Sequence, residues 1–130
     1  MNCAWPIGSP QHGRLTILVV EDEILLRMAV TDELRQQGFN VAEAANPDEA
    51  LSIIQSGIPI QLVLTEITMS GTNDGVGLAD TIRAEYPEVR VVIASGHPLE
   101  TELDHEVDGF FQKPYDISKL VVFIKALLDK

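Results

Sequence analysis

Short apolar segments rich in β-branched residues alternate with helical segments along the 130-residue chain, and this alternation constrains the fold more than any other feature. The strongest apolar segments lie at 15–20, 60–65 and 89–94, with weaker or shorter ones at 40–44 and 109–112. Strands that are apolar on both faces are typical of a parallel sheet buried between two layers of helices.

Apolar residues spaced by three and four positions predict a first helix over 23–37, ending before Gly38. Its expected inward stripe comprises Leu26, Ala29, Val30 and Leu34.

Capping residues mark the other helices. Asn46 is a good N-cap before a first-turn proline, Asp74-Gly75 begins a third helix, and Asp116 caps the last one. The segment 97–108 is acidic and poorly amphipathic, so we expect its helix, the fourth, to be short or irregular.

Strands that alternate with helices predict an α/β fold with a doubly wound parallel sheet. The leading topology is flavodoxin-like, five-stranded, with strand order 2-1-3-4-5. Residues 1–13 lack periodicity and are expected to form a flexible tail, while 14–130 form one domain.

The chain carries 20 acidic against 9 basic residues, a formal net charge of −11. This acidity argues against direct binding to DNA or to an anionic membrane. A single cysteine, Cys3, and an N-terminus without a secretory apolar region favour a cytoplasmic location.

Polar side chains follow each buried strand of the predicted sheet. In chain order they are Glu21, Asp22, Glu23, Glu66, Ser95 and Lys113. The carboxyl ends of parallel strands form one edge, where ligands bind in such folds. Clustered carboxylates suit Mg²⁺, and a lysine with a hydroxyl suits the oxygens of a phosphoryl group.

Each of these residues also has a simpler interpretation. Acids after a strand complement the dipole of the next helix, and a serine or Lys-Pro pair is common in turns. A flavin-binding protein or a phosphatase is disfavoured, because residues 21–23 would repel phosphate and lack a DxD motif. We therefore do not expect an enzyme.

The chain resembles the receiver domain of two-component response regulators over 15–130. The resemblance is carried by ILVVEDE at 17–23, LVLTEITMSG at 62–71, the Asp74-Gly75 helix start, VVIASGH at 91–97 and FFQKPYD at 110–116.

The resemblance implies a Mg²⁺ site formed by Glu21, Asp22, Glu66 and the backbone carbonyl of Thr68. Glu66 stands at the position that accepts a phosphoryl group from a histidine kinase or a histidine phosphotransfer protein.

The resemblance assigns the other polar groups as well. Lys113 matches the lysine that pairs with the phosphoryl oxygens. Ser95 matches the switch hydroxyl, and Phe110 the aromatic switch residue that turns inward on activation.

Two departures from the family stand out. The acceptor is Glu instead of Asp, and one extra methylene shifts its oxygen by an ångström or more, a misplacement that can cost about 10²-fold. Glu66 is thus expected to be a poor or absent acceptor, whose longer carboxylate reaches toward Ser95 and Lys113 and partly imitates the phosphorylated state. The interval from Ser95 to Lys113 is also about one helical turn shorter than usual.

These features predict a single-domain, stand-alone receiver, like a chemotaxis regulator, whose output is contact with a downstream protein. The alternative is a pseudo-receiver that binds partners independently of phosphorylation. Exposed apolar residues on the first helix, Ile24, Leu25 and Met28, are candidates for docking the phosphodonor. Phe123 is either part of a partner or homodimer face, formed by the fourth helix, the fifth strand and the last helix, or is partly buried.

Overall fold

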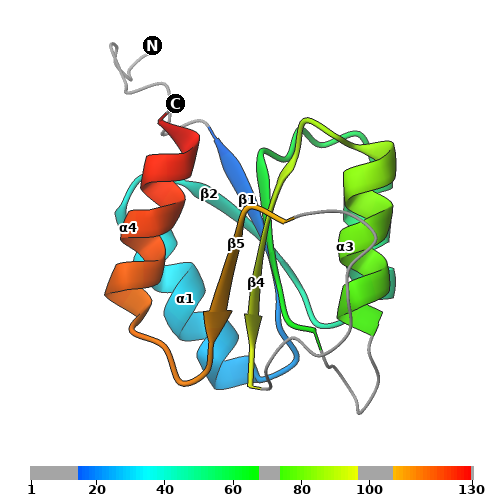
Figure 1. Cartoon of the computed structure of the whole chain (residues 1–130). Helices are drawn as coiled ribbons and strands as arrows, with labels where there is room; N and C mark the ends of the chain where they lie inside the picture. Colours follow the sequence, from blue (N-terminus) through cyan, green and yellow to red (C-terminus); the bar gives the residue numbers. More distant parts are fainter. Residues whose placement is uncertain (1–14, 68–73, 97–106, 130) are drawn as a thin grey trace, which may run out of the picture.

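The computed structural model describes residues 15–67, 74–96 and 107–129 (Figure 1). Its elements are β1 (Thr16–Val20), α1 (Ile24–Gln36), β2 (Asn40–Ala44), α2 (Pro47–Gln55), β3 (Leu62–Thr65), α3 (Asp74–Glu85), β4 (Arg90–Ser95), β5 (Gly109–Gln112) and α4 (Ile117–Leu128). The expected tail and most of the segment 97–108 lie outside the described residues, so those two predictions stay predictions.

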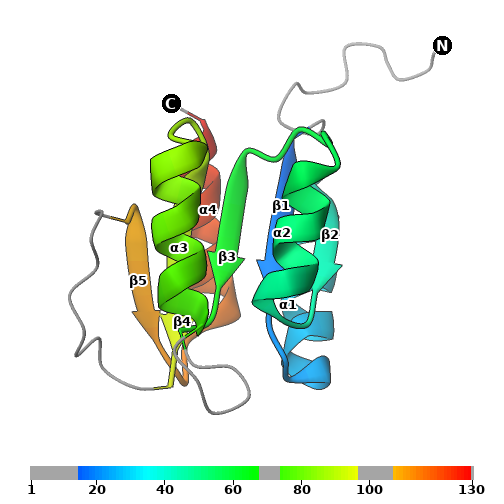
Figure 2. The ribbon, with the colours of Figure 1, turned by 90° about the vertical axis from the view of Figure 1, so that its right-hand side faces the viewer.

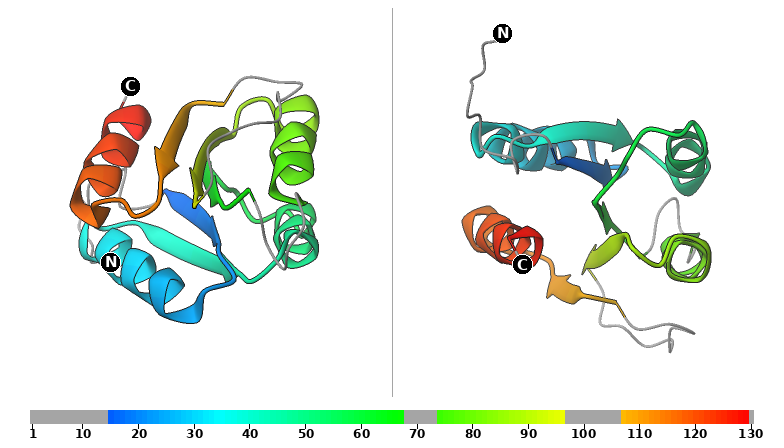
Figure 3. Two further views of the ribbon diagram at one scale, coloured as in Figure 1. Left: turned by 60° about the horizontal axis from the view of Figure 1, so that its bottom comes forward. Right: turned by 90° about the horizontal axis from the view of Figure 1, so that it is seen from above.

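The five strands form one parallel sheet of order β2-β1-β3-β4-β5, which confirms the predicted topology. Helices α1 and α4 cover one face, and α2 and α3 cover the other (Figures 1 and 3). Figure 2 looks onto the α2 and α3 layer. All strands therefore end at the same edge of the sheet.

Side chains of β1 alternate between two apolar cores. Ile17 and Val19 pack toward α1 and α4, whereas Leu18 and Val20 pack toward α2 and α3. All four are essentially buried. The apolar side chains of β1 are thus buried on both faces of the sheet, as expected for a central strand of a doubly wound sheet.

The predicted caps are present. Asn46 accepts a hydrogen bond from the Glu49 amide at 2.9 Å, and Asp116 accepts one from the Ser118 amide at 2.8 Å. Gly38 follows α1 with a φ of 97°, the left-handed conformation that favours glycine. These local signals fixed the helix ends correctly.

The predicted inward stripe of α1 is wrong at one position. Ala29 is exposed, and the buried residues are Val30, Thr31 and Leu34. Positions 27, 30, 31 and 34 share one face of a helix, so the stripe is rotated and brings Arg27 against the sheet. Alanine is common on both the buried and the exposed face of a helix, so the apolar spacing that includes Ala29 did not define the inward face of α1 uniquely.

Phe123 adopts the partly buried alternative. Its ring lies 5.3 Å from that of Phe111 in an edge-to-face arrangement. A Cβ built on Gly109 would lie 2.5 Å from Phe123 Cε2, so the ring occupies the space that this glycine leaves.

Helix α3 begins in close contact with the end of β3. The Gly75 amide donates to the Ile67 carbonyl at 2.9 Å. A Cβ at Gly75 would overlap the Glu66 carbonyl oxygen and lie 2.7 Å from Ile67 Cα, whereas a Cβ at Gly77 meets nothing within 4 Å. The absence of a side chain at Gly75 therefore permits this approach.

We predict that Gly75→Ala lowers the free energy of unfolding by about 1–3 kcal/mol, because two backbone segments must separate. Gly77→Ala, two residues along the same helix, should raise it by about 0.5–1 kcal/mol through helix propensity. Urea unfolding of both variants tests this. Equal effects of the two substitutions would contradict the steric argument.

Candidate functional site

Three polar residues continue the sheet hydrogen bonding one position beyond their strands. The Glu21 amide donates to Ala44 O at 3.0 Å, Glu66 to Val20 O at 3.3 Å, and Lys113 to Ser95 O at 2.6 Å. Each residue is therefore held in strand register at the carboxyl edge, which directs three functional side chains to one place.

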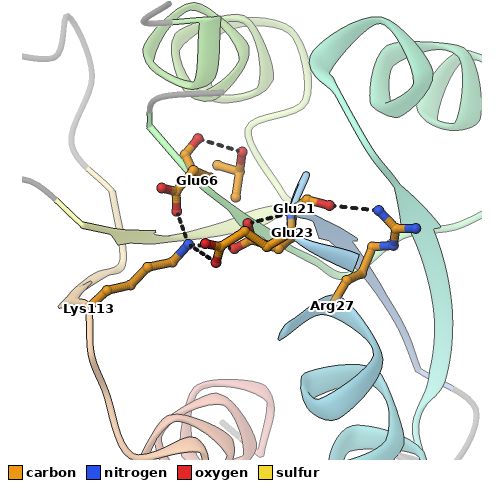
Figure 4. A network of polar contacts seen from close by, with 6 residues as sticks. Glu21, Glu23, Arg27, Glu66 and Lys113 are labelled. Atoms are coloured by element: carbon orange, nitrogen blue, oxygen red, sulfur yellow. Dashed lines mark hydrogen bonds and ion pairs between the residues drawn. The ribbon is translucent and has the colours of Figure 1, made fainter. Parts of the chain in front are cut away.

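The Lys113 ammonium lies among three glutamates (Figure 4). Its Nζ is 2.8 Å from Glu21 Oε1, 3.0 Å from Glu66 Oε2 and 3.4 Å from Glu23 Oε2. Glu21 and Glu66 are buried, and Lys113 is largely buried, whereas Glu23 is exposed. The strong contacts thus join residues that follow β1, β3 and β5.

The contact between Lys113 and Glu66 is an ion pair without a well-aligned hydrogen bond. Glu66 Oε2 is buried and has no hydrogen-bond partner among the described residues, although the ammonium is 3.0 Å away. At 3.0 Å the ammonium and the carboxylate oxygen attract each other as opposite charges. One oxygen of the acceptor-position carboxylate therefore retains bonding capacity.

Burial and mutual repulsion govern the acids. Burial raises the pKa of Glu21 and of Glu66, and Lys113 only partly opposes this rise. The charges of Glu21 and Asp22 raise the pKa of Glu66 further. Burial alone would lower the pKa of Lys113, but its two buried partners outweigh this and raise it, so the ammonium stays charged.

The remaining predicted residues are placed as follows. Ser95 is fully buried at the end of β4, and Asp22 is exposed beside Glu21. Phe110 on β5 is 37% exposed, so it is not turned into the core. Thr68 lies outside the described residues, and its proposed carbonyl contact stays a prediction.

Three residues at the site were not assigned roles from the sequence. Glu23 contacts Lys113, Arg27 Nη1 donates to Glu21 O at 2.8 Å, and Tyr115 lines two cavities beside the acids. Glu23 was visible as the third acid in a row. Arg27 could be found only once the correct face of α1 was known.

Two cavities adjoin the cluster. An enclosed one of about 10 Å³, the size of one water, is lined by Glu21, Glu66, Arg27, Tyr115 and the surrounding apolar side chains. A larger open one, about 400 Å³, is lined by Glu23, Leu26, Lys113, Pro114, Tyr115 and Ile117. Tyr115 lines both cavities.

The donor chemistry suits Mg²⁺, since hard carboxylate oxygens converge and Glu66 Oε2 lacks a hydrogen bond. Within 15–67, 74–96 and 107–129, however, no three His, Cys, Asp or Glu side chains are arranged to hold a metal ion. The ammonium of Lys113 lies between Glu21 and Glu66 instead. In this arrangement Lys113 occupies the side of Glu21 Oε1 and Glu66 Oε2 that a cation would otherwise contact.

The family model for the response regulator receiver domain matches residues 17–125. The chain belongs to this family. Receiver domains are the signalling modules of two-component response regulators, which agrees with the motifs at the carboxyl edge.

A putative NtrX-like response regulator of Rickettsia felis is 35% identical over 122 residues, covering 90% of this chain and 26% of that protein. The chain thus spans about a quarter of the length of the curated relatives it matches first.

Solved structures agree with the fold. A CheY-like receiver domain from Methanospirillum hungatei superposes with a TM-score of 0.81 at 25% identity, covering 88% of this chain and 94% of that one. The response regulator TrrA from Thermotoga maritima, in complex with Mg²⁺ and BeF, superposes with a TM-score of 0.78 at 27% identity. The match covers 88% of this chain and 99% of that one. No described helix has the length and apolar character needed to cross a bilayer.

Tyr115 should titrate unusually late. Burial and the charge of Glu21 raise its pKa to about 12. The chain has two tyrosines, so in Tyr86→Phe the phenolate absorbance reports Tyr115 alone. We predict a midpoint near 12 in the folded variant and about 10 in urea.

Because the unfolded chain loses this proton first, stability should fall as pH rises from about 10 to 12. A folded midpoint near 10 would show that Tyr115 is not buried beside the acids.

Proposed function

We propose that this chain is a receiver module in which phosphorylation at Glu66 is impaired. The observation that carries this is the 3.0 Å contact between Glu66 Oε2 and Lys113 Nζ. In the resemblance described above, this lysine pairs with phosphoryl oxygens, so the Glu66 carboxylate already occupies the partner that a phosphoryl group needs. An acceptor that is buried and ion-paired is a poor nucleophile.

The same contact imitates only part of a phosphorylated state. Glu66 supplies the negative charge at Lys113, but Phe110 remains 37% exposed rather than turned inward. We therefore favour impaired phosphorylation over full mimicry. The alternative is a pseudo-receiver that only binds partners. In that case the residues around position 66 would not support phosphorylation even with aspartate at this position.

Mg²⁺ is the proposed cofactor, held by Glu21, Asp22 and Glu66, with the Thr68 carbonyl as a further ligand. When bound, it would neutralise the charge that develops on phosphoryl oxygens. This chain's own residues supply the rest: Lys113 offers a second cation and Ser95 a buried hydroxyl.

The proposed partners are a histidine kinase or a histidine phosphotransfer protein and a downstream protein, in the cytoplasm. Ile24, Leu25 and Met28 are 61%, 81% and 52% exposed on α1, next to the acid edge. They are the proposed docking surface for the phosphodonor. Phe110 and Val122, which are exposed on β5 and α4, are the proposed output or homodimer face.

Incubation with acetyl phosphate and Mg²⁺, followed by intact mass spectrometry, tests the acceptor. We expect Glu66→Asp to gain one phosphoryl group and the unmodified chain to do so about 10²-fold more slowly or not at all. Glu66→Gln serves as the unreactive control.

Each outcome of the labelling experiment is informative. Equal labelling of the unmodified chain and the Asp variant would overturn the proposed impairment. Failure of Glu66→Asp to react would favour the pseudo-receiver, because the surrounding residues would then lack phosphoryl chemistry.

A Mg²⁺ titration tests the metal site. We predict that Asp22→Asn weakens binding by about tenfold or more, because one carboxylate ligand is lost. Lys113→Met should tighten binding, because a competing cation is removed. Glu88→Gln, exposed before β4 at the opposite edge, is the control. Mg²⁺ binding that is equal in all four proteins would contradict the proposed ligands.

A further inference from the structure

The Arg27 guanidinium joins three parts of the chain. Its Nη1 donates to the Glu21 carbonyl at 2.8 Å, and its Nε donates to Glu43 Oε1 on β2 at 3.2 Å. Figure 4 shows the guanidinium directed at the Glu21 backbone from α1. Arg27 thus connects α1 and β2 to the first acid of the site.

The position of Arg27 on α1 turns its side chain toward the sheet. It shares a face with Val30, Thr31 and Leu34, which are buried, and its own side chain is only 18% exposed. It also lines the enclosed cavity together with Glu21 and Glu66. The Arg27 side chain therefore lies partly buried beside Glu21 and Glu66 and is not a solvated surface charge.

The Glu21 backbone is fixed on both sides. Its amide donates to Ala44 O at 3.0 Å, and its carbonyl accepts from Arg27. The Glu21 carboxylate then accepts from the Glu23 amide at 3.1 Å and from Lys113 at 2.8 Å. With both neighbouring peptide groups held, the side chain leaves the backbone in one direction, toward Lys113.

Glu43 orients Arg27. Its Oε1 accepts from Arg27 Nε, and its Oε2 lies 3.6 Å from Arg35 Nη2. Arg35 also donates to a backbone carbonyl, that of Val41, at 3.1 Å. Arg27 and Arg35 therefore share a helix, a carboxylate partner and a charge, but only Arg27 reaches the site.

We propose that Arg27 is a positioning residue of the acid pocket, which holds the Glu21 peptide so that the Glu21 carboxylate stays on Lys113. The proposal rests on the role of the Lys113 cluster in the proposed function. It adds a determinant outside the cluster, and it ties the pocket to the edge strand β2 through Glu43.

The test compares Arg27→Ala with Arg35→Ala in the full chain. The readout is the exchange rate of the Lys113 Nζ protons with water, followed by ¹⁵N NMR and assigned by loss of the signal in Lys113→Met. We expect exchange about tenfold faster in Arg27→Ala, from the loss of a charge-assisted hydrogen bond, and less than about twofold faster in Arg35→Ala.

Urea unfolding of both variants separates positioning from general stability. Equal acceleration of exchange in the two variants, or none in Arg27→Ala, would overturn the proposal. Should Arg27→Ala not fold, Glu43→Ala provides the second variant, because it removes the acceptor of the Arg27 Nε hydrogen bond and keeps the arginine. It should speed Lys113 exchange by an intermediate factor, and no change there would equally count against the proposal.

The experiment also distinguishes this inference from the proposed function. Fast exchange of the Lys113 Nζ protons in the unmodified chain would show that Lys113 is not held in an ion-paired cluster. That result would reject the proposed function as well. Slow exchange that is insensitive to Arg27 would leave the proposed function intact and reject only the positioning role.

Discussion

One ammonium group organises the carboxyl edge of this sheet. Lys113 Nζ is shared by Glu21, Glu66 and Glu23 at 2.8, 3.0 and 3.4 Å. Three carboxylates face one cation. Burial raises the pKa of Glu21 and of Glu66, and the charges of Glu21 and Asp22 raise that of Glu66 further. The excess of negative charge is the feature that supports the proposed Mg²⁺ site, and Lys113 would compete with the metal ion for the same carboxylates.

The architecture could be predicted from the sequence because its signals are local. Fully apolar strands, the Asn46 and Asp116 caps and the positive-φ Gly38 each act within a few residues. The parallel sheet then follows from strand–helix alternation and right-handed crossovers. The convergence of Glu21, Glu66 and Lys113 follows in turn, because each stands directly after its strand.

The finer geometry of the site could not be predicted, because it depends on side-chain reach and helix rotation. How far Glu66 reaches depends on its side-chain rotamers. The sequence predicted reach toward both Ser95 and Lys113, and the contact with Lys113 is present at 3.0 Å. The stripe of α1 was set one position wrong at Ala29, and this concealed Arg27. Glu23, adjacent to the predicted ligands, contacts Lys113 only because its side chain is long.

The functional groups sit one residue outside the strands, on hydrogen bonds that extend the sheet without entering either core. Chemistry and folding therefore draw on different residues. Under the proposed function, glutamate in place of aspartate at this edge would alter reactivity without touching the residues that form the two cores. A single substitution would then convert a phosphorylated switch into a fixed adaptor that keeps the same scaffold.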